Sequence, residues 1–198
     1  MPGHPFREHF RKRALHREAD EVCDVEKIGF EGEEGFVQIL GPEHKSCPDG
    51  QTLLPRGITG FWSANTLPPP FLDEKAFRRM CHALAGENGG TVTKVDTDTA
   101  GRNFWFANLR RWDESVFILQ NIHYPYAAFA RQDASGGFVP AGPPKWLPPP
   151  EGPVRFLSPA QLNQDWHSLC GELNPEELEQ IRYWNPQTVG EIIFHTWD

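Results

Sequence analysis

Hydrophobic residues recur at helical spacing in residues 72–85, in the first half of the chain. Four of them fall at positions i, i+3, i+4 and i+7, on one face: Phe77, Met80, Cys81 and Leu84. Asp73 is a suitable N-cap, and the glycines that begin at Gly86 are typical of a helix end. The pattern predicts an amphipathic helix that packs its apolar face on a core.

The middle of the chain is rich in β-branched and aromatic residues, in short runs that turn residues separate. These runs predict an antiparallel meander with strands at residues 91–97, 104–109, 115–122 and 124–130. Residues 35–40 and 58–62 predict two further short strands, and residues 6–21 predict a charged helix.

The last forty residues contain three helix-start signals, each with a capping residue followed three positions later by Gln or Glu. They are Ser158 with Gln161, Asn174 with Glu177, and Thr188 with Glu191. Apolar stripes follow each signal: Leu162, Trp166 and Leu169; Leu178, Ile181 and Trp184; Val189, Ile192, Ile193 and Trp197. The third helix is expected to reach Asp198 and to pack on the core.

The sequence therefore predicts an α+β fold, a mostly antiparallel sheet with a helix before it and a three-helix C-terminal portion on or beside it. Length fits one compact domain with four parts: a charged arm at 1–34, a sheet-rich core with one helix at 35–139, a strap at 140–153, and a helical portion at 154–198. The strap contains seven prolines in fourteen residues, so it is extended chain, either a linker or a segment lying on the domain.

Charge narrows the classes of partner. The chain has 19 Lys and Arg residues and 27 Asp and Glu residues, which gives a formal charge of −8. This negative charge disfavours binding to nucleic acid. The distribution is uneven, because residues 7–17 are basic and residues 18–34 are acidic. The two blocks can pair with each other, or the basic arm can serve a nucleic-acid accessory factor, a weaker alternative.

Localisation follows from the cysteines and from apolar runs. Cys23, Cys47, Cys81 and Cys170 are scattered, and no secretory apolar core precedes them, which predicts free thiols in the cytoplasm. No run of about 18 apolar residues exists, so no membrane partner is expected.

Metal-ligating residues are present at imperfect spacing. His44 and Cys47 are spaced as zinc ligands, but Cys81 and His82 are neighbours on a helix and diverge by about 100°. Residues 96–103 resemble a calcium loop without its final Glu, and they equally suit a hairpin turn. The alternative function is a metal-dependent or hydrolytic enzyme with dispersed ligands: His44, Cys47, His82, His123, Asp96 and Asp98. The favoured interpretation has no cofactor and no catalytic residues.

Two further patterns concern surfaces. Glu176 and Glu177 suit the first turn of a helix and are expected to be solvated. Phe104 and Phe106 should share one face of a strand and leave Trp105 on the other. Trp105 is then a core residue if helices cover that face, or part of an exposed aromatic binding patch if they do not.

The favoured function is a non-catalytic, acidic interaction protein that binds a more basic protein, in its most concrete form a bacterial toxin-neutralising (immunity-type) protein. Complementary charge accelerates association and selects partners. The predicted partner-binding residues are Glu31, Glu33, Glu34 and Trp105.

Overall fold

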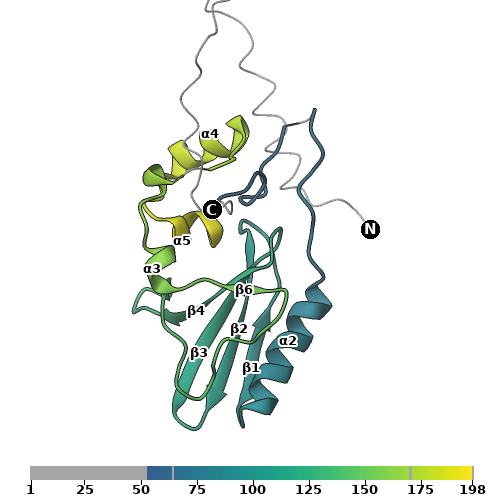
Figure 1. The fold of residues 1–198 in the computed structure, drawn as a ribbon, viewed down its shortest axis with the longest axis vertical. Coiled ribbons are helices and arrows are strands. Elements are labelled where there is room, and N and C mark those ends of the chain that lie inside the picture. The colour runs from purple at the N-terminus through teal and green to yellow at the C-terminus, as the bar shows by residue number, and fades with distance from the viewer. Residues whose placement is uncertain (1–52, 64, 170, 198) are drawn as a thin grey trace, which may run out of the picture. The chain divides into compact units, whose positions relative to one another are not determined.

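A computed structural model describes residues 53–63, 65–169 and 171–197 (Figure 1). The helix expected at residues 6–21 and the strand expected at 35–40 lie outside these ranges. The α+β class is confirmed, since the structure has an antiparallel sheet with a helix before it and several helices after it.

The sheet has six strands, and its first five lie side by side in chain order. The strands are β1 (Thr91–Asp96), β2 (Phe104–Arg111), β3 (Glu114–Asn121), β4 (Tyr126–Gln132), β5 (Phe138–Pro140) and β6 (Arg155–Phe156). Strands β1 to β4 form the predicted antiparallel meander, and β5, which was not predicted, pairs antiparallel with β4. Strand β6 pairs parallel with the start of β4, on the edge where β5 pairs with its end.

One helix precedes the sheet, and short helices follow it (Figure 1). They are α2 (Glu74–Glu87), α3 (Pro159–Leu162), the 3-10 helix η1 (Trp166–Ser168), α4 (Pro175–Trp184) and α5 (Val189–Ile193). The caps predicted for them are present: Asp73, Ser158, Asn174 and Thr188 each accept a hydrogen bond from a backbone amide of the first turn. These caps explain where the four α-helices begin.

Helix α2 covers one face of the sheet. Its side chains Phe77, Cys81 and Leu84 join a core cluster with alternate residues of β2 and β3. The Trp105 ring is part of this cluster, 2% exposed, with its centroid 5.7 Å from that of Phe77. Leu147, in the strap, is fully buried in the same cluster, so the strap lies on the domain.

The opposite face of the sheet is lined by phenylalanine rings. Strict alternation along β2 puts Phe104 and Phe106 there, as predicted, together with Leu119 of β3. Phe138 of β5 packs on both rings, with centroids 5.8 Å from Phe104 and 5.0 Å from Phe106. Phe194 packs against Phe104 from the C-terminal segment, at 6.1 Å.

Two buried asparagines join the end of the sheet to the C-terminal portion. Asn103 donates from Nδ2 to the carbonyls of Ile58 and Ile192, at 3.2 and 2.9 Å. Asn121 does the same to Ile58 and Ile193, at 3.0 and 2.8 Å. Residue 58, the end of the sheet and the end of helix α5 therefore meet at one point. The carbonyls that meet there are hydrogen-bonded to the asparagine amides.

The asparagine contacts correct two predictions. Residues 58–62 form no strand: residues 56–59 are turns, in which the Ile58 amide donates to the Pro55 carbonyl and the Gly60 amide donates to the Gly57 carbonyl. Helix α5 ends at Ile193 and does not reach residue 198, because its last carbonyls accept from asparagine side chains. Trp197 is nevertheless buried, so the predicted packing of this end on the core is confirmed.

A third correction concerns the stripe of Leu162, Trp166 and Leu169. The expected single helix is two separate pieces, α3 and η1. Asp165 interrupts it, because its carboxylate accepts from the His167 amide and starts a new turn.

His123 makes folding sensitive to acid. It is 6% exposed; burial lowers the pKa of its imidazole, more than the hydrogen bond to the Pro70 carbonyl raises it. A depressed pKa gives stability that is present above the ordinary value of 6.5 and lost as the pH falls below it. Burial also lowers the pKa of His195, in the same direction.

We therefore expect the free energy of unfolding to fall between about pH 7.5 and 5.5, by at most about 1.4 kcal/mol per pH unit for each buried histidine. Urea denaturation at both pH values measures it. His123→Gln should reduce the pH dependence, and His82→Gln, on the exposed side of α2, should leave it as in the wild type. An equal reduction in both variants would contradict the assignment.

Candidate interaction surface

Helix α4 is anchored to the rest of the fold by a buried carboxylate. Glu177 is fully buried, and its oxygens accept hydrogen bonds from Gly57 N at 2.9 Å and from Thr59 N and Oγ1 at 3.1 and 2.8 Å. It also closes the predicted capping box by accepting from Asn174 N at 3.0 Å. The expectation that Glu177 is solvated is wrong, since four donors satisfy the carboxylate inside the protein.

The opposite side of α4 carries acidic and aromatic side chains. Glu176, Glu179 and Tyr183 are spaced i, i+3 and i+7, so they share one face of the helix. Glu179 is exposed, Glu176 is partly exposed, and Tyr183 is 77% exposed. We call these three residues the α4 surface.

Aromatic rings continue from the α4 surface toward the core. Tyr183 meets Trp184 edge to face at 5.2 Å, and Trp184 meets His195 at 5.9 Å. His195 stacks on Trp197 at 3.8 Å, and Trp197 meets Phe61 at 5.1 Å. These contacts link the exposed Tyr183 through Trp184 to the core, and aromatic residues are common anchors of protein interfaces.

The charge around α4 is one-sided. Residues 156–197 contain a single basic residue, Arg182, and six acidic ones. The acidic residues are Asp165, Glu172, Glu176, Glu177, Glu179 and Glu191. Because only Glu177 among them is buried, the other carboxylates give this part of the surface a negative potential.

A pocket of about 190 Å³, with polar and apolar lining surface in similar shares, lies beside α4. Its lining residues are Leu54, Trp166, Leu169, Gly171, Leu173 and Leu178. The exposed Glu172 stands in sequence between two of them. The pocket could accept the apolar stem of a lysine or arginine side chain of a partner, while the charged end pairs with a carboxylate beside the pocket.

The residues predicted to bind a partner have different outcomes. Glu31, Glu33 and Glu34 lie outside the described ranges, as does the basic segment 7–17, so their roles stay predictions. Trp105 is buried beneath α2, so of the two alternatives stated for it the structure shows the core one.

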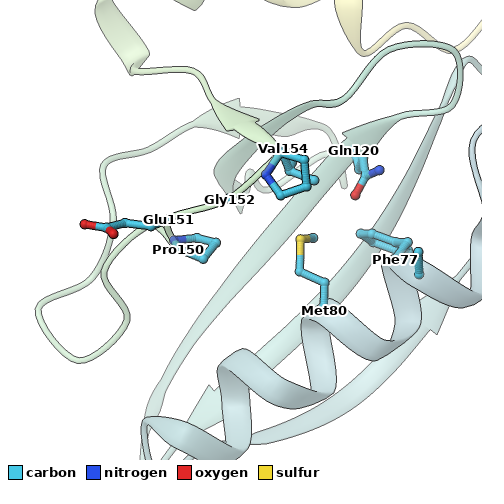
Figure 2. Close-up of a pocket in the computed structure, with 9 residues that line it drawn as sticks. Phe77, Met80, Gln120, Pro150, Glu151, Gly152 and Val154 are labelled. Carbon is cyan, nitrogen blue, oxygen red and sulfur yellow. The ribbon is translucent and has the colours of Figure 1, made fainter.

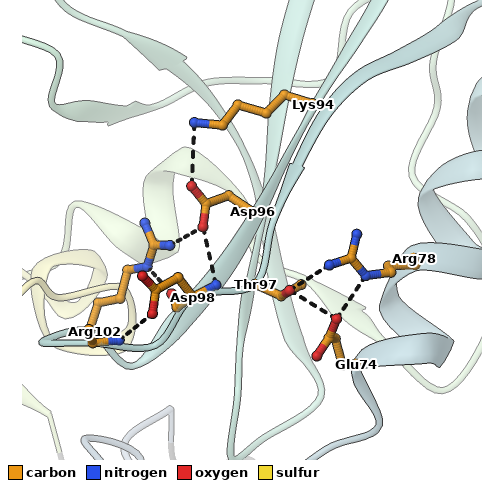
Figure 3. A network of polar contacts seen from close by, with 8 residues as sticks. Glu74, Arg78, Lys94, Asp96, Thr97, Asp98 and Arg102 are labelled. Carbon is orange, nitrogen blue, oxygen red and sulfur yellow. Dashed lines mark hydrogen bonds and ion pairs between the residues drawn. The ribbon is translucent and has the colours of Figure 1, made fainter.

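Two of the candidate metal ligands belong to a polar network at the turn between β1 and β2 (Figure 3). The Asp96 carboxylate pairs with Arg102 and, at 3.3 Å, with Lys94. Burial would raise the pKa of Asp96, but Arg102 and neighbouring donors lower it below its usual value. Asp98 caps the turn by accepting from Ala100 N at 3.0 Å. Both carboxylates are thus used by the hairpin connection.

The other candidate ligands do not converge. His44 and Cys47 lie outside the described residues, whereas Cys81 and His82 diverge on α2, Cys81 being buried and His82 exposed. Burial raises the pKa of the Cys81 thiol to about 12, so it is protonated at neutral pH. Within the part of the chain that the structure describes, no group of three or more His, Cys, Asp or Glu is arranged to hold a metal ion.

The charge pattern of the sequence already marks the region of the α4 surface. After position 155 the sequence has seven acidic residues and one basic residue, whereas the helix dipole accounts for Glu176 and Glu177 alone. Tyr183 is also recognisable as an outward residue, because it lies seven positions after Glu176 on the polar face of a capped helix.

Comparisons with protein-family models, with curated proteins and with solved structures found no match to this chain. Among the residues described here, none of the helices combines the length and the apolar character needed to cross a bilayer.

Proposed function

We propose that this chain is a non-catalytic interaction protein and that the α4 surface binds a more basic protein partner. The observation that carries the proposal is an exposed Tyr183, in ring contact with Trp184, with the carboxylates of Glu179 and Glu176 one and two turns before it on the same face of α4. Carboxylates steer a cationic partner, and an aromatic anchor supplies the desolvated contact that charge alone does not.

The α4 surface is proposed in addition to Glu31, Glu33 and Glu34, which remain a second predicted contact with the partner. A toxin-neutralising protein is the most concrete version of such a binder, because it needs fast, charge-steered association with a basic target. A cytoplasmic location is part of the proposal, supported by four cysteines scattered in the chain without a disulfide pattern.

The test begins with affinity capture from a lysate at about 50 mM salt on the immobilised wild-type chain. The captured basic protein is identified and purified, and its association rate is then measured as a function of salt. In Glu176→Gln/Glu179→Gln/Tyr183→Ser, we expect the rate at low salt to fall by about fivefold or more and its salt dependence to flatten.

A control variant removes the same number of carboxylates from a part of the surface outside α4. Glu87→Gln/Glu114→Gln removes two exposed carboxylates from the end of α2 and the start of β3. This variant should bind as the wild type does. Equal rates for the α4 variant and the wild type would overturn the proposal for this surface, and the same measurement on Glu31→Gln/Glu33→Gln/Glu34→Gln would then test the N-terminal patch alone.

A further inference from the structure

A second cavity lies far from α4 in sequence, between helix α2 and residues 150–154 (Figure 2). It has a volume of about 210 Å³. Its walls are mostly apolar and include Phe77 and Met80 of α2, Pro150 of the strap, and Val154 just after the strap. In Figure 2 the Glu151 carboxylate points away from this space.

One buried amide faces this cavity. Gln120 of β3 is 4% exposed, and its Oε1 is buried without a hydrogen-bond partner. Figure 2 shows the amide at one side of the cavity with its oxygen turned toward Met80 and Phe77. In the sheet, Gln120 stands opposite Trp105 and Ala127, so it is a polar residue on an otherwise apolar face.

An unpaired buried carbonyl oxygen is costly, and folded proteins retain one mainly where something else supplies a donor. Water is a poor donor here, because an ordered water needs two to four polar partners and these walls offer essentially the Gln120 amide. The cavity therefore suits a molecule that is apolar over most of its surface and carries a single N–H or O–H.

The volume of the cavity and the side chains that line it restrict the range of possible ligands further. A volume of 210 Å³ is below the range of about 300–1,000 Å³ that drug-sized ligands occupy, so it suits one ring or two fused rings. Phe77 and the Met80 thioether both make favourable contacts with aromatic rings.

We propose that the cavity between α2 and residues 150–154 binds a small aromatic molecule, of indole or phenol type, whose N–H or O–H donates to Gln120 Oε1. This ligand site is independent of the α4 surface and of the proposed function. It uses different residues on a different part of the fold.

Indole is the probe, and the methyl group of Met80 is the reporter. The chain has two methionines, so ¹³C-methyl-methionine labelling gives two signals, and Met80→Leu identifies the one in the cavity. We expect saturable shifts of the Met80 signal with a dissociation constant of about 1 mM or below, as for a fragment of nine non-hydrogen atoms. The compound 1-methylindole lacks the donor and should bind about tenfold more weakly.

Three variants complete the test. Gln120→Leu should keep the fold, with a thermal midpoint equal to or above the wild type, and should abolish the preference for indole over 1-methylindole. Ala76→Phe places a ring at the exposed edge of the cavity and should abolish binding of both compounds. Ala83→Phe, exposed on α2 two turns later and outside the lining, should bind like the wild type.

A parallel titration with N-acetyl-tryptophanamide separates the sources of the ring. Weaker binding than indole supports a free small molecule, whereas tighter binding supports the same ring chemistry presented on a peptide. Indole that fails to shift the Met80 signal at about 10 mM would overturn the proposal. So would equal binding of indole and 1-methylindole by the wild type.

Discussion

Glu177→Ala should lower the free energy of unfolding by about 4 kcal/mol, which is a large part of the stability of an ordinary domain. The substitution leaves four donors without their acceptor: the amides of Gly57, Thr59 and Asn174 and the Thr59 hydroxyl. Each buried donor that loses its partner costs about 1–3 kcal/mol, and partial entry of water reduces the total.

Urea denaturation followed by circular dichroism measures this change. Glu179→Ala, two residues later but exposed, is the matched control and should stay within about 0.5 kcal/mol of the wild type. Glu177→Gln keeps the shape and one acceptor oxygen, so it should fall between the two. A loss below about 1 kcal/mol for Glu177→Ala would mean that the turns at residues 57–60 are held in place without the carboxylate.

Features that depend on neighbouring residues were predictable from the sequence. The N-caps at Asp73, Ser158 and Asn174 were recognised because a cap and its amide lie within three positions of each other. The meander was predictable for the same reason, since β-branched and aromatic runs separated by turn residues follow one another along the chain and in the sheet.

Features that depend on distant residues were not predictable. Glu177 reaches donors 118 and 120 residues away, and its place in the local capping box does not reveal them. The end of α5 depends on Asn103 and Asn121, which lie on the sheet and take the last carbonyls of the helix. The apolar spacing predicts a helix that continues to the end of the chain, because the spacing carries no information about hydrogen-bond donors from distant residues.

The sequence predicted the class of partner, but it did not predict which surface would bind it. The excess of acidic residues indicated a basic partner, and that inference needs only composition. Choosing between patches requires knowing which carboxylates are buried and which aromatic rings are exposed. Trp105 and Tyr183 show the difficulty, because both are aromatic residues in amphipathic segments, yet one is 2% exposed and the other 77%.

Trp105→Ala is the second substitution for which we expect a large effect, a loss of about 3–5 kcal/mol in the free energy of unfolding. The ring is surrounded by α2 and by the α2-facing side chains of the sheet, with Phe77 at 5.7 Å and Phe71 at 6.3 Å. Removing the indole leaves a cavity among these packed side chains, and its lining loses dispersion contacts.

Trp112 provides a matched control in the same hairpin, directly after β2. It is 80% exposed, with the Arg111 guanidinium 4.4 Å from its ring, so Trp112→Ala should change the free energy of unfolding by no more than about 0.5 kcal/mol. Chemical denaturation of both variants, with near-ultraviolet circular dichroism to follow loss of the ordered indole, makes the comparison. If the two substitutions cost the same, Trp105 is not packed between α2 and the sheet, and the cavity lined by Gln120 on that face could not have the walls described for it.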